Sequence, residues 1–322
     1  MKSSKSTPRV VILGAAGFIG FHLMKHFLRS GYEVIPVDNF IRGEFDSELK
    51  KMIAEHQVDF RTLDLSAVSS YDNLFRAGDL VYNCAALNGT QNFYSSPYKV
   101  IENSAIPAIY AAKFAALAEC SRYTYFGSSE SYAGGVALNL IPIPTPEGVP
   151  LTIPNVAEAR WSYAGSKTMG ELATYAAKIE FGLKIQILRI HNIYGPRMGD
   201  KHVIPDLINK FIQGKSEVHG QTETRSFFYI DDLVEVVAKL AELDDYPEVL
   251  NIGSSSEIKI SKLAELIMEL MNLDLALADA PEFSGSVKRR CPDVSLLRSI
   301  LSYPETSLTE GLTKTIGWYR EN

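Results

Sequence analysis

The feature that most constrains the fold of this chain is a glycine pattern directly after a short apolar segment. Val10 to Leu13 form the apolar segment, and Gly14-Ala-Ala-Gly-Phe-Ile-Gly20 follows without a break. Apolar residues then recur at helical spacing as far as Arg29. Glycines at this spacing allow a tight turn, the close approach of a pyrophosphate, and close packing of the helix on the strand. A helix that begins there also presents free amide groups to an anion. The pattern therefore predicts a strand, a loop that binds a dinucleotide, and a helix.

A carboxylate at the end of the next predicted strand supports this interpretation. Glu33 to Val37 form that strand and Asp38 follows it, where a carboxylate can bind the ribose hydroxyls of adenosine. Asp38 would repel a 2′-phosphate, so the cofactor is expected to be NAD and not NADP; Arg42 is a counter-argument of lower weight. Asp64, after a later strand, either meets the adenine or caps a turn, and both interpretations stay open.

The order of apolar segments predicts the fold class. Further strands are expected at Val58 to Leu65, Leu80 to Asn83, Tyr123 to Phe126 and Lys184 to Arg189, with helical segments between them. Apolar strands that alternate with helices indicate a parallel sheet covered on both faces. We therefore expect a Rossmann-type doubly wound α/β domain over residues 9–195, with a proline-rich flap at about 134–158. Residues 196–322 are expected to form mainly a smaller, discontinuous substrate-binding lobe, with segments that return to the first domain.

Composition limits the classes of partner. The 322 residues carry a formal net charge of -6, which gives no general attraction to nucleic acid or to an anionic membrane. No apolar run reaches the ~18 residues that a membrane helix needs. The cysteines Cys84, Cys120 and Cys291 form no CxxC pair, and the histidines show no metal-ligand spacing. We expect no metal site and a location in the reducing cytoplasm.

A tyrosine and a lysine share one face of a later predicted helix. Tyr163-Ala-Gly-Ser-Lys167 places them four residues apart. Tyrosine is a poor base near neutral pH, because its ordinary pKa is ~10. A decrease of about three pKa units corresponds to roughly 4 kcal/mol, which a neighbouring ammonium and a cationic nicotinamide can supply together. Ser128, at the end of a neighbouring strand, can orient the same substrate hydroxyl. Taken alone, this spacing also fits an exposed helix face.

Several motifs in a fixed order carry a family resemblance. The chain resembles the extended short-chain dehydrogenase/reductase family, in particular its nucleotide-sugar epimerase and dehydratase branch. GAAGFIG is similar to the family's TGxxGFIG, with Leu13 in place of the threonine, and NCAA at 83–86 is similar to its HxAA segment. HNIYGPR at 191–197, RSFFYIDDLV at 225–234 and RRCPDVS at 289–295 are similar to FNVYGPR, RSFxYVxDLV and RRxPDxS. The resemblance covers almost the whole chain.

The resemblance implies an enzyme that works through transient oxidation of a sugar. Tyr163 would take the proton of the C4 hydroxyl of a nucleotide-diphosphate sugar while NAD takes the hydride, and C4 inversion is the expected outcome. The implied NAD contacts are Gly14, Gly17, Phe18, Ile19, Gly20, Asp38, Asn39, Asp64, Leu65, Ala85, Tyr163 and Lys167. The implied substrate contacts are Asn88, Thr90, Ser128, Asn192, Arg225 and Arg290. Of these, the resemblance places Asn192, Arg225 and Arg290 at the diphosphate or its flanking groups, and Asn88 and Thr90 near the sugar. For each arginine, a surface ion pair is the plain alternative.

Glu130 leaves the outcome of the reaction open. It lies in GSSESY, residues 127–132, where the predicted strand opens into a loop. Relatives that eliminate water, decarboxylate, or invert C3 or C5 carry an additional polar group at its position, two residues before Tyr132. Dehydratases have Asp-Glu at this point, whereas this chain has Ser129-Glu130, so the acid for a leaving C6 hydroxyl is missing. Ser-Glu is closer to the UDP-glucuronate decarboxylases, although the segment 159–162 departs from theirs. Glu130 is therefore a catalytic proton-transfer group or only a binding residue. A dehydratase or a nucleotide-uronate decarboxylase is the alternative to the epimerase.

Two further expectations concern assembly and catalytic competence. The alanine-rich stretches 105–118 and 173–177 indicate closely packed helix faces. The resemblance implies that they form the helix bundle of a homodimer, and core packing within one subunit is the alternative. A non-catalytic, NAD-responsive binding protein on the same scaffold is a distant alternative. Such a protein would be expected to lose the reactive tyrosine, so Ser128, Tyr163 and Lys167 favour an enzyme.

Overall fold

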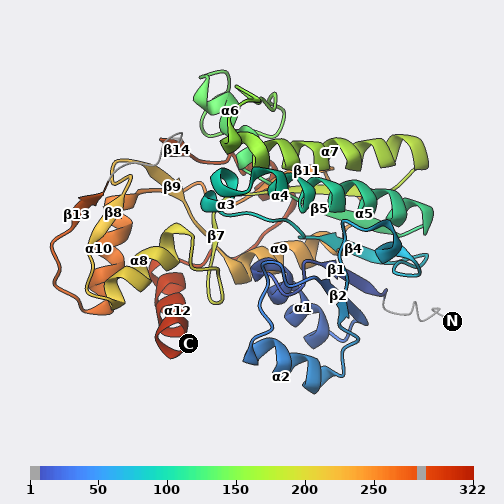
Figure 1. Ribbon diagram of the computed structural model, residues 1–322, viewed down its shortest axis with the longest axis horizontal. Helices are drawn as coiled ribbons and strands as arrows, with labels where there is room; N and C mark the ends of the chain where they lie inside the picture. Colours follow the sequence, from blue (N-terminus) through green and yellow to red (C-terminus); the bar gives the residue numbers. More distant parts are fainter. Residues whose placement is uncertain (1–7, 281–287) are drawn as a thin grey trace. The chain divides into compact units, whose positions relative to one another are not determined.

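The computed structural model describes residues 8–280 and 288–322; the side chain of Thr90 also lies outside the described part. Contacts divide the chain into two compact units (Figure 1). The first unit comprises residues up to Gly127 together with Ala157–Leu188, and the second comprises Ser128–Val156 with Arg189–Asn322.

The principal sheet has seven strands in the order β11-β6-β5-β4-β1-β2-β3. β1 pairs in parallel with β2 and β4, and the pairs β2–β3 and β4–β5 are also parallel. These findings confirm the predicted Rossmann-type sheet. The third predicted strand, Val58 to Leu65, is wrong in extent, because only Arg61–Thr62 pair with β2. The strands are β1 (Val10–Leu13), β2 (Val34–Asp38), β3 (Arg61–Thr62), β4 (Leu80–Asn83), β5 (Arg122–Ser128), β6 (Ile185–Ile190) and β11 (Val249–Ile252).

Helices cover both faces of the strands in the first unit (Figure 1). They are α1 (Phe18–Arg29), α2 (Ser47–His56), η1 (Val68–Tyr71), α3 (Thr90–Ser95), α4 (Pro97–Glu102), α5 (Ala105–Leu117), η2 (Ala159–Trp161) and α7 (Ser162–Phe181). The alanine-rich helices α5 and α7 lie side by side. Ala108, Ala111 and Ala112 of α5 are fully buried. Small residues of α5 are thus used for packing within one subunit, because they let a helix approach its neighbours closely.

The second unit begins where β5 ends. We predicted that GSSESY opens into a loop, but this is wrong from Glu130 onward, because α6 spans Glu130–Ala137. Gly134 and Gly135 lower the helix propensity of this segment. Tertiary packing overrides that propensity: a Cβ atom at Gly134 would lie 1.9 Å from the Thr152 carbonyl oxygen.

Short sheets and longer helices form the rest of the second unit. β12, β9 and β14 make a three-stranded sheet, β10 pairs with β7, and β13 pairs with β8. The helices are α8 (Val203–Ile212), α9 (Ile230–Ala241), α10 (Ile260–Met271), α11 (Ser295–Ile300) and α12 (Leu308–Glu321). The strands are β7 (Ile193–Tyr194), β8 (Glu217–His219), β9 (Thr224–Ser226), β10 (Phe228–Tyr229), β12 (Glu257–Lys259), β13 (Ala278–Ala280) and β14 (Arg289–Arg290).

Candidate active site

The glycine loop joins β1 to α1 at the point where the strand order of the sheet reverses. Gly14 has a φ of +81°, and a Cβ atom there would lie 2.8 Å from the backbone nitrogen of Ala85, just beyond β4. A Cβ atom at Gly20 would lie 2.2 Å from the Gly14 carbonyl oxygen. Gly14 therefore permits both the turn and the approach of the β4 end, and Gly20 permits α1 to lie on the loop. Ligands of open α/β sheets bind at such a reversal, outside the carboxyl ends of the strands.

The Asp38 carboxylate is fixed beside this loop. Its Oδ2 accepts a hydrogen bond from the Ala16 amide at 2.9 Å, and its Oδ1 accepts one from the Phe40 amide at 2.8 Å. Burial raises the pKa of Asp38, and these backbone donors oppose that rise. The carboxylate therefore has a defined orientation before any ligand binds, as recognition of a ribose diol requires.

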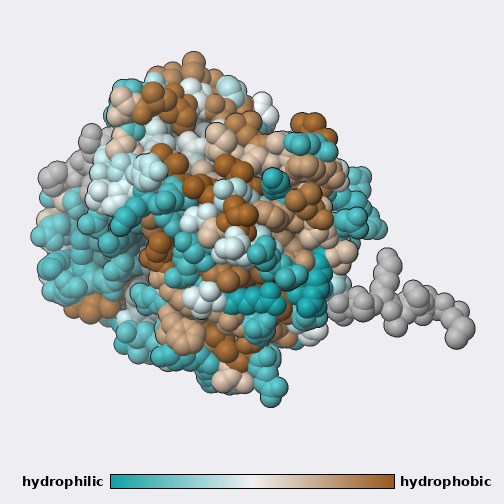
Figure 2. Space-filling view, turned by 45° about the vertical axis from the view of Figure 1, so that its right-hand side comes forward, coloured by the Kyte–Doolittle hydropathy of each residue, from teal (hydrophilic) through white to brown (hydrophobic). Residues whose placement is uncertain are grey.

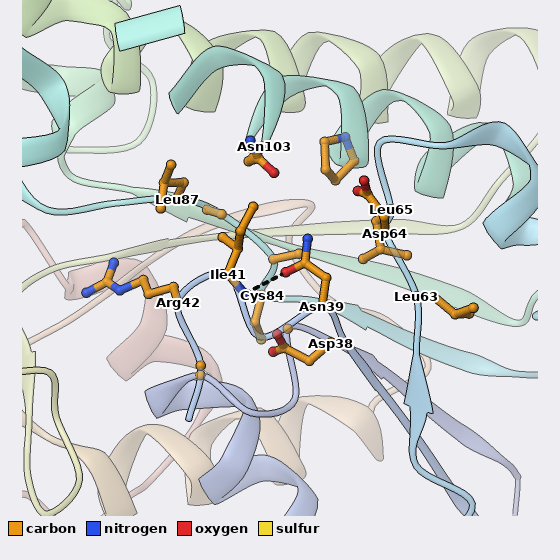
Figure 3. A pocket seen from close by; sticks show the side chains of 16 residues that line it. Asp38, Asn39, Ile41, Arg42, Leu63, Asp64, Leu65, Cys84, Leu87 and Asn103 are labelled. Atoms are coloured by element: carbon orange, nitrogen blue, oxygen red, sulfur yellow. Dashed lines mark hydrogen bonds between the residues drawn. The ribbon is translucent and has the colours of Figure 1, made fainter. Parts of the chain in front are cut away.

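A pocket of the first unit lies at this edge (Figure 3). Among the predicted cofactor residues, those that line it are Gly14, Gly17, Asp38, Asn39, Asp64, Leu65 and Ala85. Phe18, Ile19 and Gly20 instead form the first turn of α1. The sequence interpretation did not assign the lining residues Ile41, Arg42, Gly43, Leu63, Cys84, Ala86, Leu87, Asn103 and Pro107. Most of them adjoin predicted strand ends, so the signal was their position and not their residue type.

Two details of the pocket bear on the choice of dinucleotide. The Arg42 side chain points away from Asp38 (Figure 3). Asp64 accepts hydrogen bonds from the amide and the hydroxyl of Ser66, at 2.9 and 2.8 Å, and it also lines the pocket. Asp64 thus caps a turn, and its contact with the adenine stays a prediction. A loop of glycines and alanines, a helix N-terminus and an oriented carboxylate match the pyrophosphate and the adenosine ribose of NAD.

Tyr163 and Lys167 occupy the first turns of α7. The Lys167 Nζ donates to the carbonyl oxygen of Phe126 at 2.7 Å, and it lies 5.9 Å from the ring centre of Tyr163. Burial lowers the pKa of Lys167 to about 8. The Tyr163 ring stacks on Phe93, with ring centres 5.1 Å apart. The strand β5 thus fixes the ammonium, while α3 fixes the phenol ring beside it.

The strand-end residues of GSSESY belong to the second unit. The Ser128 hydroxyl accepts a hydrogen bond from the Glu130 amide at 3.2 Å. The Glu130 carboxylate forms an ion pair with Nη1 of Arg290, and each side chain is 15% exposed. Glu130 and Arg290 were predicted as site residues on separate grounds, and the fold brings them together.

The two other polar residues predicted in this unit have partners within it. Arg225 Nη2 donates to Oε2 of Glu223 at 2.5 Å, and its Nη1 donates to the Thr224 carbonyl oxygen at 2.7 Å. Burial lowers the pKa of Arg225 to about 10, and the charge of Arg290 acts in the same direction. Asn192 donates through Nδ2 to the Ser226 carbonyl oxygen at 3.0 Å. The interpretation of the sequence did not assign Glu223.

The substrate residues predicted in the first unit are only partly described. The side-chain oxygen of Asn88 is buried and has no hydrogen-bond partner. The Asn88 backbone carbonyl accepts from Asn92 Nδ2 at 2.9 Å, which fixes this turn. A buried acceptor without a partner is costly, so Asn88 is suited to receive a ligand hydroxyl. The side chain of Thr90 lies outside the described residues.

A buried polar network, which we did not predict, supports α6 in the second unit. Tyr132 donates to Asn251 Oδ1 at 2.9 Å and accepts from Arg189 Nη1 at 2.7 Å. Arg189 also donates to the Glu147 carbonyl at 2.8 Å, and Glu147 Oε1 accepts from the Asn251 amide at 2.9 Å. These contacts anchor α6 and the proline-rich segment to β11.

A family model shows the relationship of the chain. The model of the NAD dependent epimerase/dehydratase family matches residues 10–253. The chain belongs to this family. The finding confirms the resemblance inferred from the motifs, and with it an NAD-dependent enzyme whose relatives are nucleotide-sugar epimerases, dehydratases and decarboxylases.

The similarity to curated relatives extends over nearly the whole chain. The chain is 30% identical over 329 residues to the UDP-N-acetyl-alpha-D-glucosaminuronate decarboxylase of Bacillus cytotoxicus, which covers 97% of this chain and 98% of that protein. It is 28% identical over 335 residues to UDP-glucuronic acid decarboxylase 1 of Xenopus tropicalis, covering 99% and 74%.

Solved structures share the fold of this family member. A UDP-N-acetylglucosamine 4-epimerase from Methanobrevibacter ruminantium has a TM-score of 0.88 at 23% identity, covering 98% of this chain and 99% of that one. A UDP-glucuronic acid 4-epimerase from Bacillus cereus, solved with NAD, has a TM-score of 0.80 at 23% identity, covering 97% and 99%. These likenesses show the fold. We call the pocket beside Asp38 the NAD pocket, because binding of NAD there is the prediction from the sequence.

Two features are absent from the part of the chain that the structure describes. No helix within 8–280 or 288–322 is long and apolar enough to cross a bilayer. Over the same ranges, no group of three or more His, Cys, Asp or Glu side chains is placed to hold a metal ion.

Proposed function

We propose that this enzyme oxidises a UDP-linked uronate at sugar C4 and releases its C6 carboxyl group as carbon dioxide. The observation that carries this proposal is the ion pair of Arg290 with Glu130 in the first turn of α6. An arginine can bind a sugar carboxylate through two parallel hydrogen bonds. The names of the relatives at 30% and 28% identity, which are uronate decarboxylases, support the same substrate class.

The first step is removal of hydrogen from C4. Tyr163 takes the proton of the C4 hydroxyl, and the ammonium of Lys167 beside its ring favours the phenolate. Ser128 orients the hydroxyl through a hydrogen bond. When bound, NAD supplies the acceptor for the C4 hydride and later returns that hydride.

The second step follows from the position of the new ketone. A C4 ketone lies β to the C6 carboxylate, so the C5–C6 bond can break with its electron pair delocalised onto the C4 oxygen. Arg290 holds the carboxylate until carbon dioxide leaves. C5 then takes up one proton from the solvent, and we assign its transfer to Glu130, because Glu130 lies beside the Arg290 that holds the carboxylate. After C5 is protonated, Tyr163 returns the proton to the C4 oxygen.

Inversion at C4 is the second candidate function. The charge of Arg290 is already balanced by Glu130. The pair can therefore bind a neutral sugar hydroxyl without help from a substrate carboxylate. A C4 epimerase would use Tyr163, Lys167 and Ser128 in the same way and would add the hydride to the other face of the ketone. Dehydration is less favoured, because Ser129 stands where an acid for the leaving group is needed.

Mass spectrometry of the product distinguishes these candidates. Purified protein would be incubated separately with UDP-glucuronate, UDP-N-acetylglucosaminuronate, UDP-glucose and UDP-N-acetylglucosamine. Loss of carbon dioxide from a uronate is the expected result. A new isomer of unchanged mass would replace the decarboxylase by the epimerase, and loss of water would replace both by a dehydratase.

We also propose a homodimer formed through α5 and α7. Although one face of α5 is buried, other residues of the two helices are exposed, and apolar side chains reach the surface of the molecule (Figure 2). Leu172 is 60% exposed and Ile179 82% exposed. Two copies of this helix pair would bury these side chains in a bundle. Light scattering of wild-type protein and of Leu172→Asp tests the assembly.

The proposed location is the cytoplasm. Cys84, Cys120 and Cys291 are all free thiols. Free thiols persist in a reducing compartment, whereas an oxidising one favours disulfides.

A further inference from the structure

Four charged side chains form an ionic cluster in the second unit. Arg225 pairs with Glu223, and Arg290 pairs with Glu130. The side chains of the first pair are each 10% exposed, and those of the second are each 15% exposed. The two pairs lie side by side, because Arg225 of β9 and Arg290 of β14 are register partners in the parallel pairing of these strands. The charge of Arg290 lowers the pKa of Arg225, and the charge of Glu130 raises it. We refer to Glu130, Glu223, Arg225 and Arg290 as the charge quartet.

The fold holds the Glu223 carboxylate in a defined position. The Glu223 amide donates to the Gly220 carbonyl at 2.9 Å, and its own carbonyl accepts from the Ile260 amide at 3.0 Å. Gly220 has a φ of +62°, and a Cβ atom there would lie 2.8 Å from the carboxyl carbon of Glu223. Glycine at 220 therefore leaves room for the carboxylate against the turn, from which it reaches Arg225.

The net charge of the quartet is zero, since two arginines face two glutamates. A pair of unmatched arginines would attract a dianionic diphosphate strongly. In this protein a diphosphate that approaches Arg225 meets a guanidinium whose charge is already balanced. Binding must then weaken the Arg225–Glu223 contact or place a third negative charge beside it.

We propose that Glu223 is a specificity-determining residue that competes with the substrate diphosphate for Arg225. The inference rests on the proposed function, together with the contact of Arg225 with the diphosphate that the family resemblance implies. Its consequence is selectivity against free nucleotides. The terminal phosphate of free UDP can carry a second negative charge, which the sugar ester of a UDP-sugar removes, so Glu223 repels UDP more strongly than the complete substrate. Glu223 therefore lowers the affinity for UDP and keeps the site available to the complete substrate.

A matched control pair lies in the same small sheet. Glu257 of β12 forms an ion pair with Arg289 of β14 at 2.5 Å, and the Arg289 side chain is 50% exposed. Glu257 also accepts from the Thr224 hydroxyl at 2.7 Å, so it contacts the residue next to Arg225. Glu257→Gln thus removes a paired carboxylate close to the quartet but leaves the quartet intact.

Calorimetry with UDP and with inorganic pyrophosphate tests the proposal on the NAD-loaded protein. Glu223→Gln keeps the shape and an acceptor for Arg225 but removes the charge. We expect it to bind both probes on the order of tenfold more tightly than wild type, while Glu257→Gln stays within about twofold of wild type. Inhibition of the reaction by UDP should strengthen in the same proportion in Glu223→Gln.

Further variants separate the possible failures. Unchanged or weaker UDP binding in Glu223→Gln would overturn the proposal, since Glu223 would then only hold Arg225 in place. If Glu223→Gln does not fold, Glu223→Asp keeps a charge but weakens the pair, and it must tighten UDP binding by a smaller factor. Arg225→Gln tests the underlying assignment: undiminished UDP binding in that variant would remove Arg225 from the diphosphate site. If Arg225→Gln loses UDP binding but Glu223→Gln does not bind UDP more tightly, Arg225 stays in the diphosphate site. Only the proposed competition by Glu223 is then rejected.

Discussion

The NAD pocket of the first unit and the charge quartet of the second solve the recognition of anions in opposite ways. The pocket uses backbone: Gly14 and Gly17 line it, and α1 begins directly after Gly17 with no side-chain cap. The quartet uses full charges, and each arginine already has a carboxylate partner. A preformed backbone site suits a cofactor that stays bound. A balanced ionic site suits a substrate that must leave after each turnover.

The largest effect is expected at Tyr163, next to the NAD pocket. Tyr163→Phe removes the base but keeps the ring that stacks on Phe93. We expect turnover to fall by about 10⁴-fold, with no rise in reduced-cofactor absorbance when substrate is added. The matched control is Tyr125→Phe, because the Tyr125 hydroxyl is buried without a hydrogen-bond partner. If Tyr163→Phe shows the same rise in reduced-cofactor absorbance as wild type, Tyr163 is not the catalytic base.

The second effect tests the charge quartet, because a change at Glu130 separates oxidation at C4 from the chemistry at C5. Glu130→Gln should still form enzyme-bound NADH, since Tyr163, Lys167 and Ser128 perform the oxidation. In heavy water, the formation of product that carries deuterium at C5 should slow by about 10²-fold. Single-turnover absorbance and mass spectrometry measure the two steps. If Glu130→Gln changes only substrate affinity and wild-type product carries no C5 deuterium, Glu130 is a binding residue and C4 inversion becomes the better proposal.

These two regions also differ in how far the sequence predicted them. The glycine loop, Asp38 and the Tyr163–Lys167 pair lie within short segments or at strand ends, so local pattern and the topology of a parallel sheet place them. The Arg290–Glu130 pair joins residues 160 apart in the chain, and no local pattern encodes that contact. Glu223 was missed because an isolated glutamate in a loop gives no signal until Arg225 lies beside it.

The α6 helix was missed for a related reason. Its two glycines indicate a loop by propensity, and only close packing against residues such as Thr152 makes them necessary. The network of Tyr132, Arg189 and Asn251 joins α6 to strands that are distant in sequence. Tertiary contacts therefore decide the structure of the second unit more than local preference does.

A smaller effect should follow from adding one methyl group to the glycine loop of the NAD pocket. Gly14→Ala places a Cβ atom 2.8 Å from the Ala85 nitrogen and also imposes a positive φ on alanine. We expect NAD affinity to fall by more than about tenfold, because the loop must shift. Gly31→Ala is the control: its φ is +79°, but nothing lies within 4 Å of the added atom. Equal NAD affinity in the two variants, measured by calorimetry, would show that the close approach at Gly14 does not matter.

The smallest effect concerns the charge of Lys167, the one cationic side chain among the predicted NAD contacts. Burial lowers its pKa from 10.5 to about 8. The ammonium that favours the Tyr163 phenolate is therefore lost as pH rises through about 8, and turnover should fall about twofold at that pH relative to neutral.

Folding stability should respond in the opposite direction. Between about pH 8 and pH 10.5 the unfolded chain holds a proton on Lys167 that the folded protein has lost. The contribution of this group to the free energy of unfolding is thus fully present above the unfolded pKa and is lost as pH falls through the folded pKa. Initial rates and denaturant unfolding, both measured from about pH 6 to about pH 10, check the two trends. A rate that stays level across this range would show that the ammonium does not assist Tyr163. A rate and a stability that fall together above pH ~8 would instead point to general unfolding.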